Sequence, residues 1–250
     1  MSRRSAKFIP VVDLFAGPGG LGEGFSAYTD CRGRQPFKIA ISVEKEELAH
    51  RTLLLRSFYR QFPRGEVPTE YYEHVRGNSS FDSFVADIQK SSQGRHAVAE
   101  ARRHELGADP ALDKQLSREI ADKIGGDDCV LIGGPPCQAY SLVGRSRNKG
   151  RRGYRLEDDP RARLYLEYLQ LIADLWPAVF VMENVKGLLS SQMDGERVFD
   201  QIYADLSDPA DASRGARSPR GKKHRYKIRS LTVDGESRQL TPSDFVIRCE

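Results

Sequence analysis

Cys137 is the residue best placed for covalent chemistry. It follows an apolar run, Cys129–Gly133, and the turn Gly134-Pro135-Pro136. Ligand sites of α/β proteins lie at the carboxyl ends of central strands, and two prolines end such a strand in a rigid turn. A cysteine there is presented rather than buried, and basic residues downstream would favour its thiolate. We predict that Cys137 is a nucleophile and that Cys129, inside the apolar run, is a core residue.

Glu183 is a second candidate, because it ends the apolar run Ala178–Met182. If both runs are parallel strands, the two side chains lie along one edge of the sheet. We expect this carboxyl group to be partly desolvated, which would raise its pKa and let it hold or donate a proton. Taken alone, the same acid would also suit a helix cap before Lys186-Gly187.

A glycine-rich turn follows the first apolar run. Asp13-Leu14-Phe15 leads into Ala16-Gly17-Pro18-Gly19-Gly20, and such a turn lets backbone approach a ligand and points helix N–H groups at it. Glu44 ends the second run, where a carboxylate can accept hydrogen bonds from both hydroxyls of a ribose. Asp87, ending the third, could accept one from an adenine amino group. A glycine turn alone is often only a tight corner, but the three strand ends together favour a nucleoside cofactor.

The type of cofactor is less constrained by spacing. A dinucleotide and S-adenosylmethionine would both fit three successive strand ends. The loop lacks the Gly-x-Gly-x-x-Gly phosphate pattern, and Asp13 would suit the cationic amine of a methionine nearby. Both points favour S-adenosylmethionine.

These residues require a parallel sheet that brings strand ends together. Short apolar runs alternate with helical patterns, which predicts an α/β fold with a mostly parallel sheet and helices on both faces. The predicted strands are Ile9–Phe15, Phe37–Val43, Ser83–Ala86, Cys129–Gly133 and Ala178–Met182. The predicted helices are Gly20–Tyr28, Lys45–Phe62, Arg95–Ile124 with a break near Gly107–Pro110, Arg163–Trp176 and Glu196–Leu206. We interpret the charged stretch at about 91–125 as a helical insertion.

Composition excludes several classes of protein. The 250 residues are 39% hydrophobic and 30% charged, as in a globular domain, and no apolar run is long enough to cross a bilayer. The basic start is no signal peptide, so we expect a cytoplasmic protein. Four cysteines lack metal-ligand spacing, so no metal site is predicted. The net charge of +4 is concentrated in residues 145–155 and 214–229, which on charge alone could be solvated loops.

Three motifs together resemble the DNA cytosine-5 methyltransferase family. They are Asp13-Leu14-Phe15-Ala16-Gly17-Pro18-Gly19-Gly20, Gly134-Pro135-Pro136-Cys137-Gln138-Ala139-Tyr140-Ser141 and Glu183-Asn184-Val185, in this order. The resemblance covers nearly the whole chain apart from the insertion. It implies a Rossmann-like S-adenosylmethionine-dependent methyltransferase fold for residues 1–250 and methylation of cytosine C5 in double-stranded DNA, which would have to flip the base out of the helix.

The resemblance also implies a role for individual residues. Cys137 would add to C6 of cytosine, and Glu183, with Asn184 beside it, would stabilise protonation at N3. A mobile loop at about 138–159 would close over the base. The cofactor would be lined by Asp13, Phe15, Ala16, Gly17, Gly19, Gly20, Glu44, Asp87, Pro136 and Leu166. The candidate DNA contacts are Gln138, Ser141, Arg145 and Arg147.

One departure from the family concerns the C-terminal side. After Glu-Asn-Val the family carries a Gln-x-Arg-x-Arg motif, a target-recognition region and a closing helix, and these are absent from the 250 residues. The domain is therefore expected to be incomplete, as a fragment or with the remainder on a second polypeptide. In that case its sheet lacks a final strand beside the one that ends at Glu183.

Three other functions compete with this one. A tRNA cytosine-C5 methyltransferase shares the chemistry, and the Gln-Ala-Tyr-Ser continuation after Cys137 favours DNA. A non-catalytic binding subunit of a split methyltransferase suits an incomplete domain but leaves the intact Cys137 and Glu183 unexplained. A nicotinamide oxidoreductase does not account for the Pro-Pro-Cys turn. A place in a restriction–modification system and the recognition sequence are left open.

Overall fold

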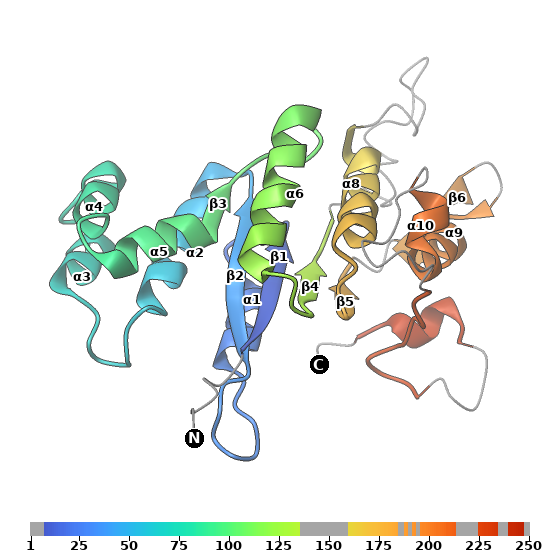
Figure 1. Ribbon diagram of the computed structural model, residues 1–250, viewed down its shortest axis with the longest axis horizontal. Coiled ribbons are helices and arrows are strands. Elements are labelled where there is room, and N and C mark those ends of the chain that lie inside the picture. The colour runs from blue at the N-terminus through green and yellow to red at the C-terminus, as the bar shows by residue number, and fades with distance from the viewer. Residues whose placement is uncertain are drawn as a thin grey trace. The chain divides into compact units, whose positions relative to one another are not determined.

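Five parallel strands form the main sheet of the computed structural model (Figure 1). Their order is β3-β2-β1-β4-β5, and the bounds are Ile9–Leu14 for β1, Phe37–Glu44 for β2, Ala101–Arg103 for β3, Val130–Gly133 for β4 and Val179–Met182 for β5. The central strands are buried because apolar side chains line both of their faces, as is typical of parallel sheets. The prediction of a mostly parallel α/β fold is confirmed.

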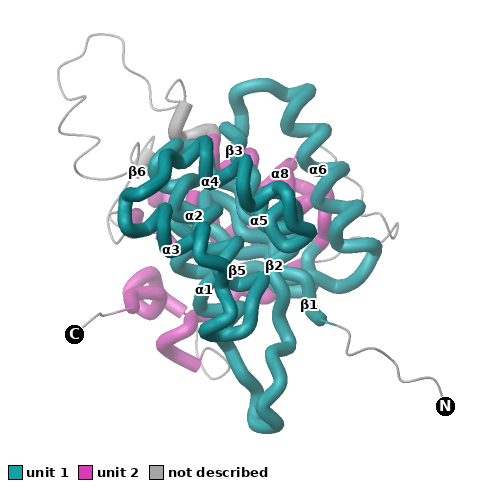
Figure 2. The backbone as a smooth tube through the Cα atoms, turned by 90° about the vertical axis from the view of Figure 1, so that its left-hand side faces the viewer, with its two compact units in different colours: residues 1–134, 177–182 teal, residues 135–176, 183–250 magenta. Residues whose placement is uncertain are grey.

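The structure describes residues 8–135, 160–184, 188–189, 192–193, 196–213, 225–234 and 240–247. The chain divides into two compact units, which Figure 2 colours separately. Unit 1 comprises residues 1–134 and 177–182, and unit 2 comprises residues 135–176 and 183–250. No helix of the described residues is long and apolar enough to cross a membrane.

Unit 1 holds the sheet and its helices. These are α1 at Gly20–Ala27, α2 at Glu47–Tyr59, α3 at Thr69–Val75, α4 at Phe81–Ile88, α5 at Ser92–Glu100 and α6 at Pro110–Ile124. In Figure 1, α6 lies in front of the sheet and α1 behind it. Phe25 of α1 packs on a buried cluster of Val11, Ile39, Val130 and Ile132, one side chain or two from each central strand. Helices therefore cover both faces, as predicted.

The predicted strand at Ser83–Ala86 is wrong, because this segment is the middle of α4. The Ser80 hydroxyl caps the helix by accepting a hydrogen bond from the Ser83 N–H at 3.1 Å. Phe84 and Ile88 are four residues apart, so they lie on the same face of α4, and both are buried. A four-residue apolar run does not by itself distinguish strand from helix, and here the cap and the tertiary contacts favour the helix.

The third strand instead lies inside the charged stretch at about 91–125. This stretch holds α5, then β3, then α6, and β3 pairs with the end of β2 through Ser42↔Ala101 and Glu44↔Arg103. Asp109 caps α6, and Leu116, Ile120 and Ile124 bury one side of that helix. The stretch is thus partly helical, as expected, but it also extends the sheet.

Unit 2 is mainly helical in its described part. It contains α8 at Pro160–Leu175, the short antiparallel pair β6 at Gln192–Met193 and β7 at Glu196–Arg197, α9 at Val198–Ser207, α10 at Pro209–Ala212 and the 3-10 helix η3 at Pro242–Phe245. Tyr168, Leu169 and Ile172 are fully buried on α8, and the Tyr165 hydroxyl donates to Asp205 of α9 at 3.0 Å. The predicted helices at Arg163–Trp176 and Glu196–Leu206 are confirmed with shifted ends.

Candidate cofactor and catalytic site

The loop Phe15–Gly19 connects β1 to α1 in a conformation that needs glycine. Gly17 and Gly19 have φ of 55° and 92°, in the left-handed region that glycine adopts without strain. Phe15 shares this region at φ 55°, and such strain in a non-glycine residue concentrates at functional sites. The Ala16 N–H donates to the Val43 carbonyl at 3.0 Å, and the Gly19 N–H to the Ala16 carbonyl at 2.9 Å. The loop is therefore fixed to the end of β2.

One side of this loop is packed and the other is open. A Cβ atom on Gly19 would lie 2.8 Å from Leu53 Cδ1 of α2, closer than side-chain carbons approach. A Cβ atom on Gly17 or Gly20 would meet nothing within 4 Å. The open side thus has room for a ligand beside the backbone of Gly17 and Gly20, as a nucleoside cofactor requires.

Glu44 lies at the end of β2, as predicted, and its carboxylate holds two backbone groups. Oε2 accepts from the Gly17 N–H at 2.7 Å, and Oε1 accepts from the Glu46 N–H at 2.7 Å. Each carboxylate oxygen can accept more than one hydrogen bond, so both remain able to bind ribose hydroxyls. Sequence reasoning did not foresee that Glu44 also organises the glycine loop.

Asp13, a predicted site residue, is almost completely buried, at 1% exposure. Within the described residues neither of its carboxyl oxygens accepts a well-formed hydrogen bond. Burial raises the pKa of Asp13 to about 7, while the Gly22 N–H and the charge of Arg60 oppose that rise and the Glu44 carboxylate adds to it. A Cβ atom on Gly22 would lie 2.9 Å from Oδ2, so α1 closes over this carboxyl group. Because it is buried, the Asp13 carboxyl group is better suited to balance the charge of a nearby cation than to bind a ligand directly from an exposed position.

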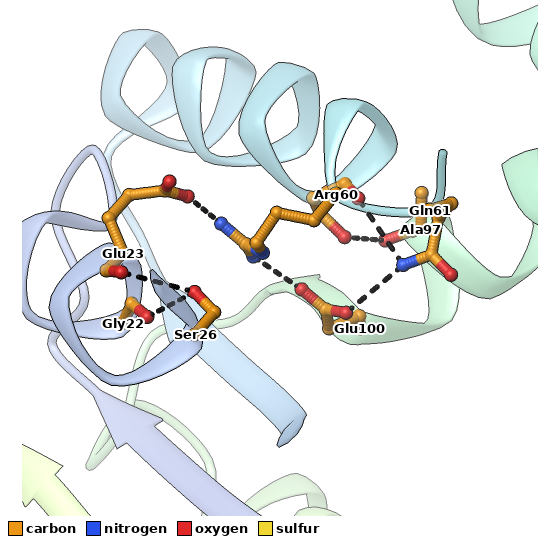
Figure 3. A network of polar contacts seen from close by, with 8 residues as sticks. Gly22, Glu23, Ser26, Arg60, Gln61, Ala97 and Glu100 are labelled. Atoms are coloured by element: carbon orange, nitrogen blue, oxygen red, sulfur yellow. Dashed lines mark hydrogen bonds and ion pairs between the residues drawn. The ribbon is translucent and has the colours of Figure 1, made fainter. Parts of the chain in front are cut away.

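Arg60 links three helices behind the loop, as Figure 3 shows. Its side chain is 14% exposed; Nη1 pairs with Glu23 of α1, and Nη2 pairs with Glu100 of α5 at 2.5 Å. The Gln61 amide donates to the second Glu100 oxygen at 3.3 Å. The sequence does not indicate this network, although Leu53, Arg56 and Arg60 have the spacing of one helix face.

Asp87 does not lie at a strand end, contrary to the prediction. It occupies the last turn of α4, is exposed, and pairs with Lys90 at 2.7 Å. The residue that does end the third strand is Arg103. The expected contact between Asp87 and an adenine amine therefore loses its structural basis.

The strands before Cys137 and Glu183 pair with each other in parallel. The register Val130↔Val179 to Gly133↔Met182 makes β4 and β5 end opposite one another. The Asn184 amide Nδ2 then donates to the Pro135 carbonyl at 3.4 Å. Asn184 is thus hydrogen-bonded to Pro135, which precedes Cys137 by two residues in the sequence. The Glu183 side chain is exposed, so the expected partial desolvation is not observed.

Of the two cysteines around the fourth strand, Cys129 lies in the described part of the chain and Cys137 does not. Cys129 is 1% exposed, and burial, helped by the charge of Asp128, raises the pKa of its thiol to about 11. Its prediction as a core residue is confirmed. Leu166, which the resemblance places near the cofactor, is exposed on α8. The predicted residues outside the described part of the chain are Pro136, Cys137, Gln138, Ser141, Arg145 and Arg147.

Comparisons with known proteins point to one family, the DNA methylases. A family model described as C-5 cytosine-specific DNA methylase matches residues 110–209. The type II methyltransferase M.Bpa9945I of Bacillus paralicheniformis is 33% identical over 225 residues, which cover 82% of this chain and 48% of the relative. The type II methyltransferase M.AgeI of Thalassovita gelatinovora is 30% identical over 193 residues, covering 77% and 31%.

A third relative carries the reaction in its name. M.ApeKI of Aeropyrum pernix, a DNA (cytosine-5-)-methyltransferase, is 46% identical over 84 residues, which cover 33% of this chain and 17% of the relative. The chain spans about half the length of the Bacillus relative and less of the other two.

Proposed function

Because this chain belongs to the C-5 cytosine-specific DNA methylase family, we propose that it transfers a methyl group from S-adenosylmethionine to C5 of cytosine in DNA. The observation that carries the proposal is the hydrogen bond from Asn184 to the Pro135 carbonyl. This bond links the residue after Glu183 to a residue two positions before Cys137. The proposed reaction needs an acid and a nucleophile, and these two residues would supply them.

The residues around the glycine loop fit the cofactor. The proposed site comprises the backbone of Phe15, Ala16, Gly17, Gly19 and Gly20, the carboxylate of Glu44 for the ribose, the buried Asp13 as a charge partner of the methionine amine, and Pro136. The open space over Gly17 and Gly20 supports this assignment. S-adenosylmethionine supplies an electrophilic methyl group when it is bound. Asp87 is not included, because it lies in α4.

The proposed chemistry uses Cys137 and Glu183 in opposite roles. The Cys137 thiolate forms a bond to C6 of the cytosine while Glu183 holds a proton at N3, which makes C5 nucleophilic. Bound S-adenosylmethionine would supply the methyl group to C5 and would leave as S-adenosylhomocysteine. Loss of the C5 proton to a base then lets the bond from C6 to sulfur break, which restores the Cys137 thiolate and returns the N3 proton to Glu183. Asn184 positions the turn that carries Cys137. A stacked base cannot be attacked in this way, so the cytosine is flipped out.

The proposed partner is double-stranded DNA. Gln138, Ser141, Arg145 and Arg147 would contact it from the loop after Cys137, with the basic side chains on phosphates. Sequence-specific readout is assigned to the half of the relatives that this chain does not span, either in the same polypeptide or in a second one.

Trapping on a modified substrate tests the proposal. A duplex with 5-fluorocytosine at the target position cannot lose its C5 substituent as a proton, so a reacting enzyme stays attached. With S-adenosylmethionine present and the region matching the rest of the Bacillus relative supplied, we expect a covalent adduct at Cys137, none in Cys137→Ser, and an unchanged yield in Cys129→Ser. If intact protein binds the duplex but forms no adduct, a non-catalytic binding subunit becomes the better assignment; an adduct on tRNA alone would favour the RNA substrate.

A further inference from the structure

We infer that Arg60 is a positioning residue that holds the cofactor loop from behind, without touching the cofactor. The inference rests on the proposed function, because the loop matters only if it binds S-adenosylmethionine. Arg60 belongs to neither the glycine motif nor the end of a strand. The evidence for its role is the network of polar contacts drawn in Figure 3.

One face of the helical segment at residues 53–60 contacts the glycine loop at Gly19 and the first turn of α1 at Glu23. Leu53, Arg56 and Arg60 follow each other at intervals of three and four residues and so lie on the same side. Leu53 Cδ1 and Arg56 Cδ would lie 2.8 and 3.8 Å from a Cβ atom on Gly19. Arg60, one turn further on, pairs with Glu23 in the first turn of α1. The glycine loop and the first turn of α1 therefore both contact α2 or Arg60, the residue that follows α2.

The contacts form a continuous path from Arg60 into the loop. Glu23 pairs with Arg60 through its side chain, and its backbone N–H donates to the Gly19 carbonyl at 3.0 Å. The Gly19 N–H in turn donates to the Ala16 carbonyl at 2.9 Å. Glu23, which pairs with Arg60, thus also makes the hydrogen bond that joins the first turn of α1 to the glycine loop. A shift of Glu23 must therefore move the loop.

The charge arrangement favours a positioning role over a simple stabilising one. Arg60 is 14% exposed and Glu100 is 10% exposed, so most of the energy of this pair offsets their desolvation. What the planar guanidinium adds is orientation, because its fork engages carboxylates from α1 and α5 in fixed directions. Burial raises the pKa of Asp13, over which α1 closes, and the positive charge of Arg60 opposes that rise.

Hydrogen exchange together with cofactor titration tests the inference on the 250-residue chain. The test variant is Arg60→Met, which keeps the length of the side chain and removes the fork; Arg60→Lys, with one ammonium for two carboxylates, is the milder form should Arg60→Met fail to fold. The control is Ile120→Ala, which removes a fully buried side chain from α6. Each protein is measured at the same interval below its own unfolding temperature.

In Arg60→Met we expect amide exchange of residues 16–24 to be faster by about tenfold than in the control, because the loop opens locally. S-adenosylmethionine affinity, measured by calorimetry, should fall by about tenfold, the effect of losing one charge-assisted hydrogen bond. Adding Glu23→Gln to Arg60→Met should accelerate exchange no further, since both changes break the same path.

Exchange of residues 16–24 that equals that of the Ile120→Ala control would overturn the inference, and so would unchanged affinity in a variant with a loosened loop. If the unmodified chain fails to bind S-adenosylmethionine, the proposed function itself falls and the role of Arg60 in cofactor binding falls with it. The exchange measurement needs no cofactor, so these two failures are distinguishable.

Discussion

Two carboxyl groups at neighbouring strand ends have opposite environments. Glu44 is partly exposed and accepts two backbone N–H groups, whereas Asp13 is buried without a well-formed hydrogen bond in the described part of the chain. Hydrogen bonds from N–H groups stabilise a carboxylate, and burial without them disfavours its charge. The two acids therefore suit different tasks, with Glu44 binding hydroxyl groups and Asp13 responding to a nearby cation.

Replacing Glu44 tests the first task. Glu44→Ala removes the ribose acceptor and the bond to the Gly17 N–H together, and charge-assisted hydrogen bonds contribute about 1.5–3 kcal/mol each. We expect calorimetry to show S-adenosylmethionine affinity reduced at least about tenfold, with DNA affinity little changed. Glu47→Ala, an exposed acid of the same region, is the control. Unchanged cofactor affinity in Glu44→Ala would remove this residue from the site.

The pH dependence of stability tests the second task. The pKa of Asp13 is about 7 in the folded protein against 3.8 for an ordinary Asp, so between these values the unfolded chain loses the proton and the folded one keeps it. The free energy of unfolding should therefore fall, relative to Asp13→Asn, as pH rises from about 4 to about 7, by up to about 4 kcal/mol. Urea unfolding across this range measures the difference, and parallel curves for the two proteins would contradict the assignment.

The two cysteines offer a matched comparison. Cys137→Ser should abolish methyl transfer and leave S-adenosylmethionine affinity nearly intact, because the thiolate acts on the base and not on the cofactor. Cys129→Ser should retain activity as long as it folds, because a buried thiol with a pKa of about 11 is not ionised at neutral pH. Equal loss of activity in both, at unchanged stability, would count against Cys137.

At the scale of elements, the glycine loop connects β1 to α1 and contacts β2 and α2. Its packed side meets Leu53, and its open side faces no protein atom within 4 Å of a Cβ on Gly17 or Gly20. Packing and ligand binding are thus assigned to different glycines within a few residues. Substitutions can separate them.

Gly19→Ala and Gly20→Ala form the matched pair. Gly19→Ala places a methyl group 2.8 Å from Leu53 Cδ1 at a φ of 92°, and we expect it to destabilise the fold by about 1–3 kcal/mol. Gly20→Ala enters open space and should change stability by no more than about 0.5 kcal/mol, yet weaken S-adenosylmethionine binding. Thermal unfolding with and without cofactor measures both effects. Normal cofactor binding by Gly20→Ala would place the ligand elsewhere.

At the scale of the molecule, the chain contains the glycine loop and both proposed catalytic motifs but spans only about half of its Bacillus relative. Residues 1–250 alone should bind duplex DNA through phosphate contacts, without sequence preference, and the affinity should drop about a hundredfold between roughly 50 and 200 mM salt. Site-specific methylation should appear only when the region matching the rest of that relative is supplied. Labelled cofactor on duplex DNA measures this, and site-specific turnover by the 250 residues alone would disprove it.

Local sequence was enough to determine four of the five strands, the glycine loop and the position of Glu44. Apolar runs, glycines and prolines determine the backbone conformation within a few residues. Their effect can therefore be predicted without knowing which distant segments they contact. The same holds for Cys129, whose burial follows from the run in which it lies.

Only the tertiary structure decided the third strand, the position of Asp87 and the role of Arg60. Three residues of β3 form a strand because the end of β2 pairs with them, whereas the apolar run at Ser83–Ala86 became a helix once its cap formed and Phe84 found a core. Arg60 meets Glu23 and Glu100 across 37 and 40 residues of chain. Contacts over such separations leave no periodic trace in the sequence, since each partner alone is an ordinary charged residue on a helix.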